Sequence, residues 1–138
     1  MPMSSSIDAA TRLERGRRMF ERSIGGSAQA FIDGIAAVAP DFGPLILEWE
    51  FADVYSRDTI DLKTREIVIL AACAALGATG ADAVKLHVKA ALRAGVTRQQ
   101  IAEILMQVGF AAGLPAALCA IGAVKAAFAE MDASDTNG

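Results

Sequence analysis

The chain has 138 residues, the usual size of one compact domain, which argues against a two-lobed enzyme with a cleft between its lobes. Hydrophobic residues make up 54% of it but aromatic residues only 6%, because 29 residues are alanine. Small apolar side chains favour closely packed helices over sheets. The net charge of −3 argues against a nucleic-acid partner, whose phosphates require a clustered basic surface.

The two cysteines, Cys73 and Cys119, lie in alanine-rich apolar runs without CxxC spacing, so we expect two reduced, buried thiols. The N-terminal residues contain no apolar segment followed by a small-residue cleavage site, so we expect no secretory signal. Both features predict a cytoplasmic protein.

One uncharged stretch, residues 104–124, is long enough to cross a bilayer. Gln107, Pro115 and three glycines weaken membrane insertion, so we expect no membrane span. A helix that is apolar over most of its surface is instead expected in a core or between subunits. This demand for burial is large for so small a chain, which predicts a homo-oligomer.

Three helices are predicted in the first part of the chain, over residues 11–24, 27–39 and 45–57. Ser27 can cap the second of them with its side-chain oxygen. The third contains Trp49, and we interpret it as a helix because no neighbouring strand is available to pair with it.

Four further helical segments are predicted, over residues 62–78, 83–95, 97–113 and 116–131. Thr97 and Gln100 have the spacing of a capping box. The last two segments form one apolar run, which residues 113–115 (Gly-Leu-Pro) interrupt with a bend. The sequence therefore predicts an all-α fold of about six helices.

The two ends of the chain, residues 1–10 and 132–138, are polar and lack periodic apolar positions. We expect them to be flexible tails around a single all-helical domain over residues 11–131.

His87 is the only histidine, and the rest of its helix face is apolar. A core histidine bonded to a backbone carbonyl is one interpretation. Glu66 favours another, because a four-residue turn joins the two predicted helices and they are expected to pack as an antiparallel hairpin. Glu66 and His87 can then meet, and a carboxylate that orients an imidazole suits general acid or base catalysis.

Cys73 lies two turns beyond Glu66 on the same face of one helix, so a proton relay to a thiolate is conceivable. Thiol exchange needs a resolving partner, and the residues that follow Cys73 offer none. One histidine with scattered carboxylates lacks the ligand spacing of a metal site, so none is predicted. The sequence has no phosphate loop or nucleotide fingerprint, so we expect no dinucleotide cofactor.

Arg57 and Arg65 stand near several acidic residues, where surface ion pairs or caps are the common outcome. Their alternative role is bidentate binding of a substrate carboxylate. Trp49 and Tyr55 belong to an aromatic cluster that suits core packing, but also the wall of a pocket beside two arginines.

Several stretches resemble the carboxymuconolactone decarboxylase family, which shares an all-helical fold with alkylhydroperoxidase D-like proteins. They are an opening helix (residues 12–26), WEFADVYSR (residues 49–57), the Thr-Arg of residues 64–65 before an apolar helix, and LHVKAALRAGVTRQQI with the later GLPAA (residues 86–117). These motifs occur in the family's order, and together they cover most of the chain.

The resemblance implies a cofactor-free active site around His87 in an oligomer, a trimer or a hexamer. Glu66, Arg65 and Arg57 match functional positions of the family. The peroxidase branch places a CxxC pair between the glutamate and the histidine, and this chain lacks it. A dithiol peroxidase mechanism is therefore not expected.

The resulting hypothesis is a decarboxylase of a small cyclic, unsaturated carboxylated lactone. His87 and Glu66 would be its catalytic residues. The residues expected around the substrate are Arg65, Arg57, Trp49, Tyr55 and Cys73. Two alternatives stay open: a single-thiol peroxidase or reductase that uses Cys73, and a non-catalytic subunit of an oligomer.

Overall fold

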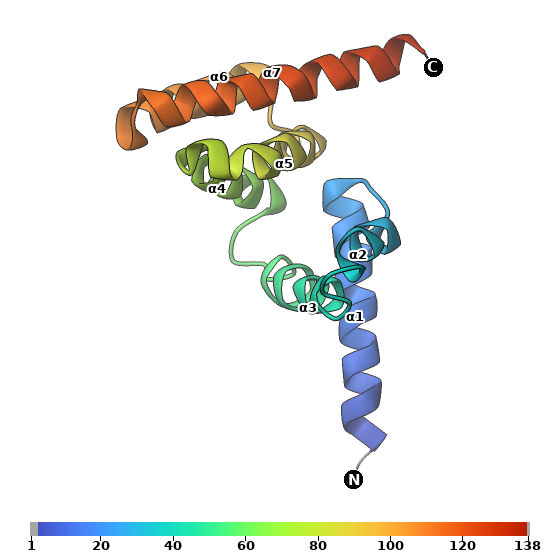
Figure 1. Cartoon of the computed structure of the whole chain (residues 1–138). Coiled ribbons are helices and arrows are strands. Elements are labelled where there is room, and N and C mark those ends of the chain that lie inside the picture. Colours follow the sequence, from blue (N-terminus) through green and yellow to red (C-terminus); the bar gives the residue numbers. More distant parts are fainter. Residues whose placement is uncertain (1–2, 138) are drawn as a thin grey trace. The chain divides into compact units, whose positions relative to one another are not determined.

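The computed structural model describes the backbone of residues 3–137 and the side chains of residues 11–137. All regular elements in this part of the chain are helical, and they are shown in Figure 1. They are α1 (Met3–Ile24), α2 (Ala28–Ala36), α3 (Phe42–Ile46), η1 (Leu47–Val54), α4 (Leu62–Ala75), η2 (Gly77–Gly80), α5 (Ala81–Arg93), α6 (Arg98–Ala112) and α7 (Leu114–Thr136). The all-α fold class is confirmed.

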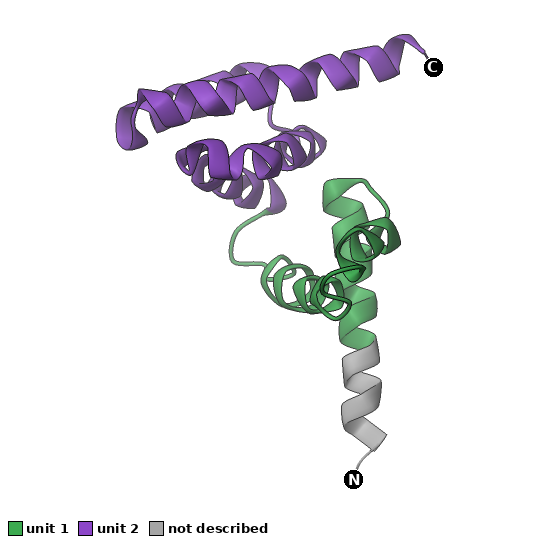
Figure 2. Cartoon of the chain, in the orientation of Figure 1, with its two compact units in different colours: residues 1–61 green, residues 62–138 purple. Residues whose placement is uncertain are grey.

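The chain forms two compact units, residues 1–61 and residues 62–138 (Figure 2). The sequence had predicted one domain over residues 11–131. The division falls after the non-helical stretch that separates η1 from α4, and each unit has a core of its own. The predicted site residues are therefore divided between the two units.

Unit 1 is organised around α1, which packs along η1. Gly16 allows this packing, because a Cβ atom at that position would lie 2.2 Å from the carbonyl oxygen of Leu47. The core is aromatic: the Phe20 ring meets the Phe51 ring edge-on at 5.0 Å, and Phe51 packs on Tyr55 at 4.6 Å. Aromatic side chains thus fill the space between the helices of this unit.

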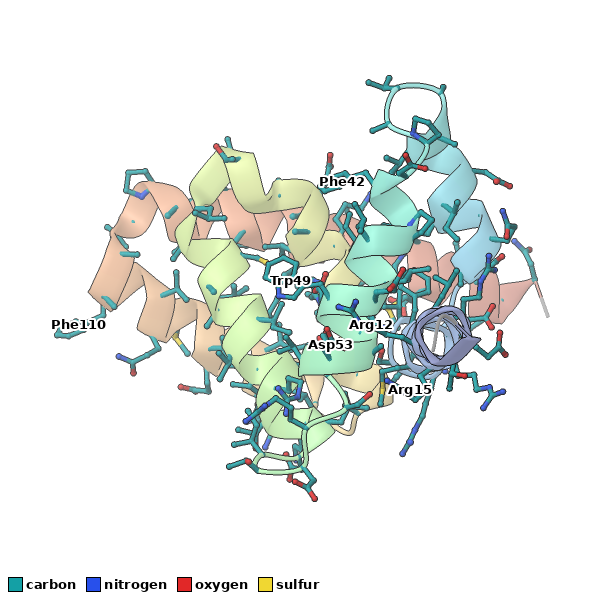
Figure 3. The ribbon with its side chains drawn as sticks, turned by 90° about the horizontal axis from the view of Figure 1, so that it is seen from below. Arg12, Arg15, Phe42, Trp49, Asp53 and Phe110 are labelled. Atoms are coloured by element: carbon teal, nitrogen blue, oxygen red, sulfur yellow. The ribbon has the colours of Figure 1, made fainter. Side chains whose placement is uncertain are left out.

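A π-helix, η1, continues directly from α3. At its end the Tyr55 backbone N–H donates to the Glu50 carbonyl over 2.8 Å, a step of five residues. The predicted helix over residues 45–57 is present, but its wider turns were not foreseen. Arg12 of α1 holds η1 through hydrogen bonds to Asp53 and a 3.3 Å contact with Glu48; Figure 3 shows Arg12 next to Asp53.

Unit 2 consists of two helical hairpins, α4 with α5 and α6 with α7 (Figure 1). Its core is aliphatic and rich in alanine, with members such as Leu70, Ala74, Val84 and Val88. Gly80 lets the first hairpin close tightly, because a Cβ atom there would lie 2.0 Å from the Cys73 carbonyl oxygen. Small side chains replace the aromatic rings of unit 1.

The predicted caps are present. The Gln100 backbone N–H donates to Thr97 Oγ1 and the Gln100 side chain accepts from the Thr97 N–H, both over 3.0 Å. The Ala30 N–H donates to Ser27 Oγ over 3.1 Å. The interruption predicted at residues 113–115 is present, because Gly113 has a φ of +109° and separates α6 from α7.

The C-terminal helix is longer than predicted. α7 continues to Thr136, so most of the expected tail over residues 132–138 is helical, and Arg98 anchors it through Asp132 over 2.6 Å. At the other end, a tail was predicted for residues 1–10. Two of these residues lie outside the described part of the chain. The others form the start of α1, whose backbone is helical from Met3.

By length and composition alone, α7 could cross a membrane: its most apolar window has a mean hydropathy of 1.5, and 28% of that window is buried. The core helix of a soluble protein passes the same test. The uncharged stretch over residues 104–124 is not one helix, because Gly113 divides it.

Candidate active site

The α4–α5 hairpin brings Glu66 and His87 into contact. Glu66 lies in the second turn of α4, and His87 lies near the middle of α5. Because the helices run antiparallel through the short η2 turn, residues 21 positions apart face each other. The distance between Glu66 Oε2 and His87 Nδ1 is 3.0 Å. The convergence expected from the hairpin is therefore observed.

The pair is enclosed by the core of unit 2. Glu66 has no exposed surface, and His87 is 6% exposed. An ionised carboxylate in such a place is costly unless a donor compensates it, and His87 supplies one. With Glu66 as a carboxylate, which can only accept, Nδ1 carries the hydrogen of this contact and Nε2 is left as the atom of His87 that could serve a substrate.

Arg65 precedes Glu66 on α4 and is also buried. Its Nε atom donates no hydrogen bond, although the residue interacts through other atoms. A buried donor without an acceptor costs about 1–3 kcal/mol, so an acceptor group from a ligand would be favourable at this atom. Arg65 thus lies in the same unit as the Glu66–His87 pair and on the same helix as Glu66.

Cys73 lies two turns after Glu66 on α4, is half-buried and packs against the core of unit 2. Its carbonyl oxygen is the group that Gly80 approaches. Cys119, on α7, is half-buried as well, and both thiols are free of disulfides. Among the residues with described side chains, no three His, Cys, Asp or Glu residues gather as metal ligands would.

The three other predicted site residues, Trp49, Tyr55 and Arg57, belong to unit 1. Tyr55 is buried in the aromatic core against Phe51. Of the two roles considered for it, core packing and a pocket wall, this is core packing. Trp49 is 68% exposed and projects from η1 (Figure 3). Arg57 is exposed in the stretch after η1.

Unit 2 also contains two apolar grooves that the sequence did not reveal. One, of about 660 Å³, lies between α6 and α7 and includes Leu105 and Phe128. The other, of about 310 Å³, lies between α4 and α6 and includes Ile67 and Ala71. Neither groove is lined by Glu66 or His87. The apolar stripes of these helices indicated burial, but not which neighbour provides it.

Comparisons with known proteins agree with this architecture. The model of the carboxymuconolactone decarboxylase family matches residues 40–126. An uncharacterized 15.0 kDa protein of the nqo9–nqo10 intergenic region of Paracoccus denitrificans is 33% identical over 87 residues, which are 63% of this chain and 65% of that protein.

A 4-carboxymuconolactone decarboxylase of Acinetobacter baylyi is 30% identical over 91 residues, which are 66% of each chain. The chain thus spans slightly less than two thirds of the length of these relatives. The matched residues include the π-helix of unit 1 and the Glu66–His87 hairpin of unit 2. This chain belongs to the carboxymuconolactone decarboxylase family.

Proposed function

We propose that this protein is a cofactor-independent carboxy-lyase that removes CO2 from a small cyclic, unsaturated carboxylated lactone. Family membership and the Acinetobacter relative support a decarboxylase or alkylhydroperoxidase D-like role in general. The buried contact between Glu66 and His87 carries the narrower proposal, because it provides an oriented proton donor in a water-poor place.

The reaction needs a group that handles charge and a proton. When the bond between the ring carbon and the carboxylate breaks, CO2 leaves and the electron pair moves through the conjugated double bond to the lactone carbonyl. The product of this step is a dienolate. A proton must then reach the carbon, and a fixed donor near the developing oxyanion lowers the barrier by about 2–4 kcal/mol.

In this proposal His87 supplies that proton from Nε2. Glu66 holds Nδ1 and stabilises the imidazolium before the transfer, which leaves a neutral ring whose Nδ1–H still bonds to Glu66. Glu66 is thus the positioning residue for His87, and the two act as one unit.

Within unit 2, two more of the predicted residues would bind the substrate. Arg65 would anchor a carboxylate through its guanidinium fork, the geometry that suits carboxylates best. Cys73 would contact the ring. The buried Nε of Arg65 supports its part in this assignment.

We also propose that the protein is a cytoplasmic homo-oligomer, a trimer or a hexamer. A single copy leaves large apolar side chains exposed around the α6–α7 connection, where Phe110 is 89% exposed and Leu114 and Leu118 are exposed as well. Figure 3 shows Phe110 pointing away from the ribbon. Apolar surface of this kind usually marks an interface.

The test uses 4-carboxymuconolactone and measures CO2 release by the full chain. We expect turnover by the wild type and a loss of about 100-fold or more in His87→Ala, with an unchanged circular dichroism spectrum. Cys119→Ser is the matched control and keeps wild-type turnover, because Cys119 lies on α7, outside the hairpin that carries the pair.

Equal turnover by wild type and His87→Ala would remove His87 from the mechanism. A wild type that releases no CO2 but reduces a peroxide, with rapid alkylation of Cys73, would replace the proposal by the thiol alternative. Neither activity, with the oligomer intact, would favour a non-catalytic subunit.

A further inference from the structure

Helices α6 and α7 lie side by side in unit 2 and form a groove of about 660 Å³ (Figure 1). Its buried lining residues include Ile101, Leu105 and Val124, which belong to the core of the unit. Mostly apolar hollows of about 300–1,000 Å³ are typical of small-molecule sites. Neither Glu66 nor His87 lines this groove, so it is separate from the candidate active site. We call it the α6–α7 groove.

The α6–α7 groove is amphipathic along its length. Its charged lining residues are Arg98, Lys125 and Asp132. Met106 and Ile121 line the other half, which lies closer to the turn between the two helices and belongs to an uncharged stretch of the sequence. A ligand that follows the groove therefore meets charge in one half and apolar side chains in the other.

Two of the three charges neutralise each other. Arg98 donates hydrogen bonds to both carboxylate oxygens of Asp132, over 2.6 and 3.2 Å. These bonds lower the pKa of Asp132, so its carboxylate stays ionised at neutral pH. The guanidinium carbon of Arg98 also lies 4.3 Å from the centroid of the Phe128 ring. The pair therefore adds no net charge to its end of the groove.

Lys125 supplies the remaining charge. Its side chain is exposed, and it forms no hydrogen bond or ion pair with the side chains of residues 11–137, which the structure describes. Glu130 on the same helix binds Lys85 and Lys89, and Glu103 on α6 lines a separate hollow. A lysine can keep its alkyl chain on apolar surface and its ammonium group in water. Lys125 thus gives the groove one net positive charge at its edge.

An apolar groove with one cation at its edge matches an amphiphile with an anionic head. The carboxylate would pair with Lys125, and the tail would cover Leu105, Met106 and Ile121. At a rise of 1.5 Å per residue, α6 runs along the groove for about 12 Å from Arg98 to Met106, which suits a chain of about eight to ten carbons. We propose that the α6–α7 groove binds a medium-chain carboxylate, with its head group at Lys125.

The charge of Lys125 favours this occupant over others. A second copy packed on the same groove would bury an uncompensated ammonium group from each chain, which is costly. An alkylammonium ion would be repelled by Lys125. A neutral alcohol would keep the contacts of the tail but would form no ion pair.

This site is independent of the proposed decarboxylation, whose Glu66–His87 pair lies on α4 and α5. A ligand in the groove would contact core residues such as Ile101 and would stabilise the folded chain. Binding can therefore fail while turnover persists, and the reverse also holds.

The first experiment titrates the full chain with sodium octanoate, below its micelle concentration, and follows binding by calorimetry. We expect octanoate to bind, and hexanoate to bind about tenfold more weakly because it buries two fewer methylene groups. Octanol should bind about fivefold more weakly than octanoate, since it keeps the tail but lacks the ion pair. Octyltrimethylammonium should not bind.

Substitutions at Lys125 test the ion pair. Lys125→Gln should weaken octanoate binding about fivefold and leave octanol binding within about twofold of wild type. Lys125→Glu should abolish octanoate binding and allow octyltrimethylammonium to bind, because the charge is reversed. Lys63→Gln is the matched control: it removes the same charge from α4, outside the groove, and keeps octanoate binding within about twofold of wild type.

A bulky side chain tests the groove itself. Ala126 and Ala129 are both exposed on α7, but of these two only Ala129 lines the groove. Ala129→Phe should weaken the binding of octanoate and octanol alike by about tenfold or more, because the ring fills the space of the tail. Ala126→Phe should keep both affinities within about twofold of wild type. Circular dichroism and sedimentation compare the fold and the oligomeric state of the two variants.

Three results would overturn the proposal. One is the absence of octanoate binding by the wild type. Another is an equal loss of octanoate and octanol affinity in Lys125→Gln, which would show that Lys125 does not pair with the carboxylate. The third is dissociation of an oligomer by Ala129→Phe but not by Ala126→Phe, which would assign the groove to a second copy of the chain.

Discussion

The two units solve the same packing problem with different side chains. In unit 1 aromatic rings, with Phe20 and Phe51 at the centre, fill the core beside the close approach of α1 and η1 at Gly16. In unit 2 alanine and branched aliphatic side chains let the helices approach until Gly80 touches the Cys73 carbonyl. Among the residues with described side chains, the buried contact between a carboxyl group and an imidazole lies in unit 2. Short side chains thus bring two polar groups from neighbouring helices within hydrogen-bond distance inside a core.

The charged contacts differ in the same way. In unit 1 Arg12 reaches Asp53 and Glu48 at the surface, where water screens the interaction. In unit 2 Glu66 and His87 meet in the interior. We therefore expect substitutions in rings to matter most in unit 1 and substitutions in polar groups to matter most in unit 2.

The largest expected effect is that of Phe51→Ala, which removes the ring between Phe20 and Tyr55. It should lower the free energy of unfolding by about 4 kcal/mol, because it deletes a buried aromatic side chain and leaves a cavity. Hydrogen exchange should show the loss of protection in α1 and η1, while α4 and α5 stay protected. Phe42→Ala, at an exposed ring, is the control with little effect.

Equal loss of protection in α4 and α5 of the Phe51→Ala variant would contradict the separation into two units.

Glu66→Ala is expected to cost about 3 kcal/mol of unfolding free energy, because it leaves His87 buried without its acceptor. Glu66→Gln should cost less, since the amide oxygen can still accept from Nδ1. Urea denaturation measures both. Asp53→Asn removes a carboxylate from the exposed contact in unit 1 and should change the free energy of unfolding little. A loss as large as that of Glu66→Ala would show that the exposed contact stabilises unit 1 as much as the buried contact stabilises unit 2.

Two glycines test the close approaches directly. Gly16→Ala and Gly80→Ala each place a Cβ atom within about 2 Å of a backbone oxygen, and we expect each to cost about 2 kcal/mol. The controls are Gly34→Ala in α2 and Gly122→Ala in α7, where a Cβ atom meets nothing within 4 Å. These should gain about 0.5 kcal/mol through helix propensity. Thermal melts of all four variants rank the effects. An unchanged melting temperature of Gly80→Ala would show that the first hairpin can widen without a loss of stability.

Local signals in the sequence predicted the local features well. Thr97 with Gln100 gave the capping box, and the short turn between two apolar helices gave the contact of Glu66 with His87, because an antiparallel hairpin fixes which residues can meet. Ser27 likewise marked the start of α2.

Features that depend on distant parts of the chain could not be predicted. A π-helix shows the same apolar stripe as an α-helix over one or two turns, so η1 was interpreted as an ordinary helix. The extension of α7 to Thr136 follows from Arg98 reaching Asp132 across 34 residues. Periodicity also contains no information on which stripes face the same core, so it cannot assign the helices to the two compact units.

The smallest expected effect is acid-dependent and involves Glu130, which ties α7 to α5. Lys85 and Lys89 donate hydrogen bonds to its two oxygens, and these bonds lower its pKa from 4.5 to about 2. A carboxyl whose pKa is lower in the folded state contributes stability above its unfolded pKa, and this contribution is lost as the pH falls toward the folded value. The wild type should therefore lose part of its stability between pH 4.5 and 2 through this contact.

Glu130→Gln has no carboxylate to protonate, so its stability should fall less steeply over the same pH range. Hydrogen exchange in the second half of α7 measures the difference, because the two lysines act on that part of the helix. Asp53→Asn in unit 1 is the matched comparison, since the Arg12 hydrogen bond lowers the pKa of Asp53 in the same direction. If α7 of wild type and Glu130→Gln responds to acid identically, the two lysine contacts do not hold the helix, and the docking of α7 rests on its apolar face alone.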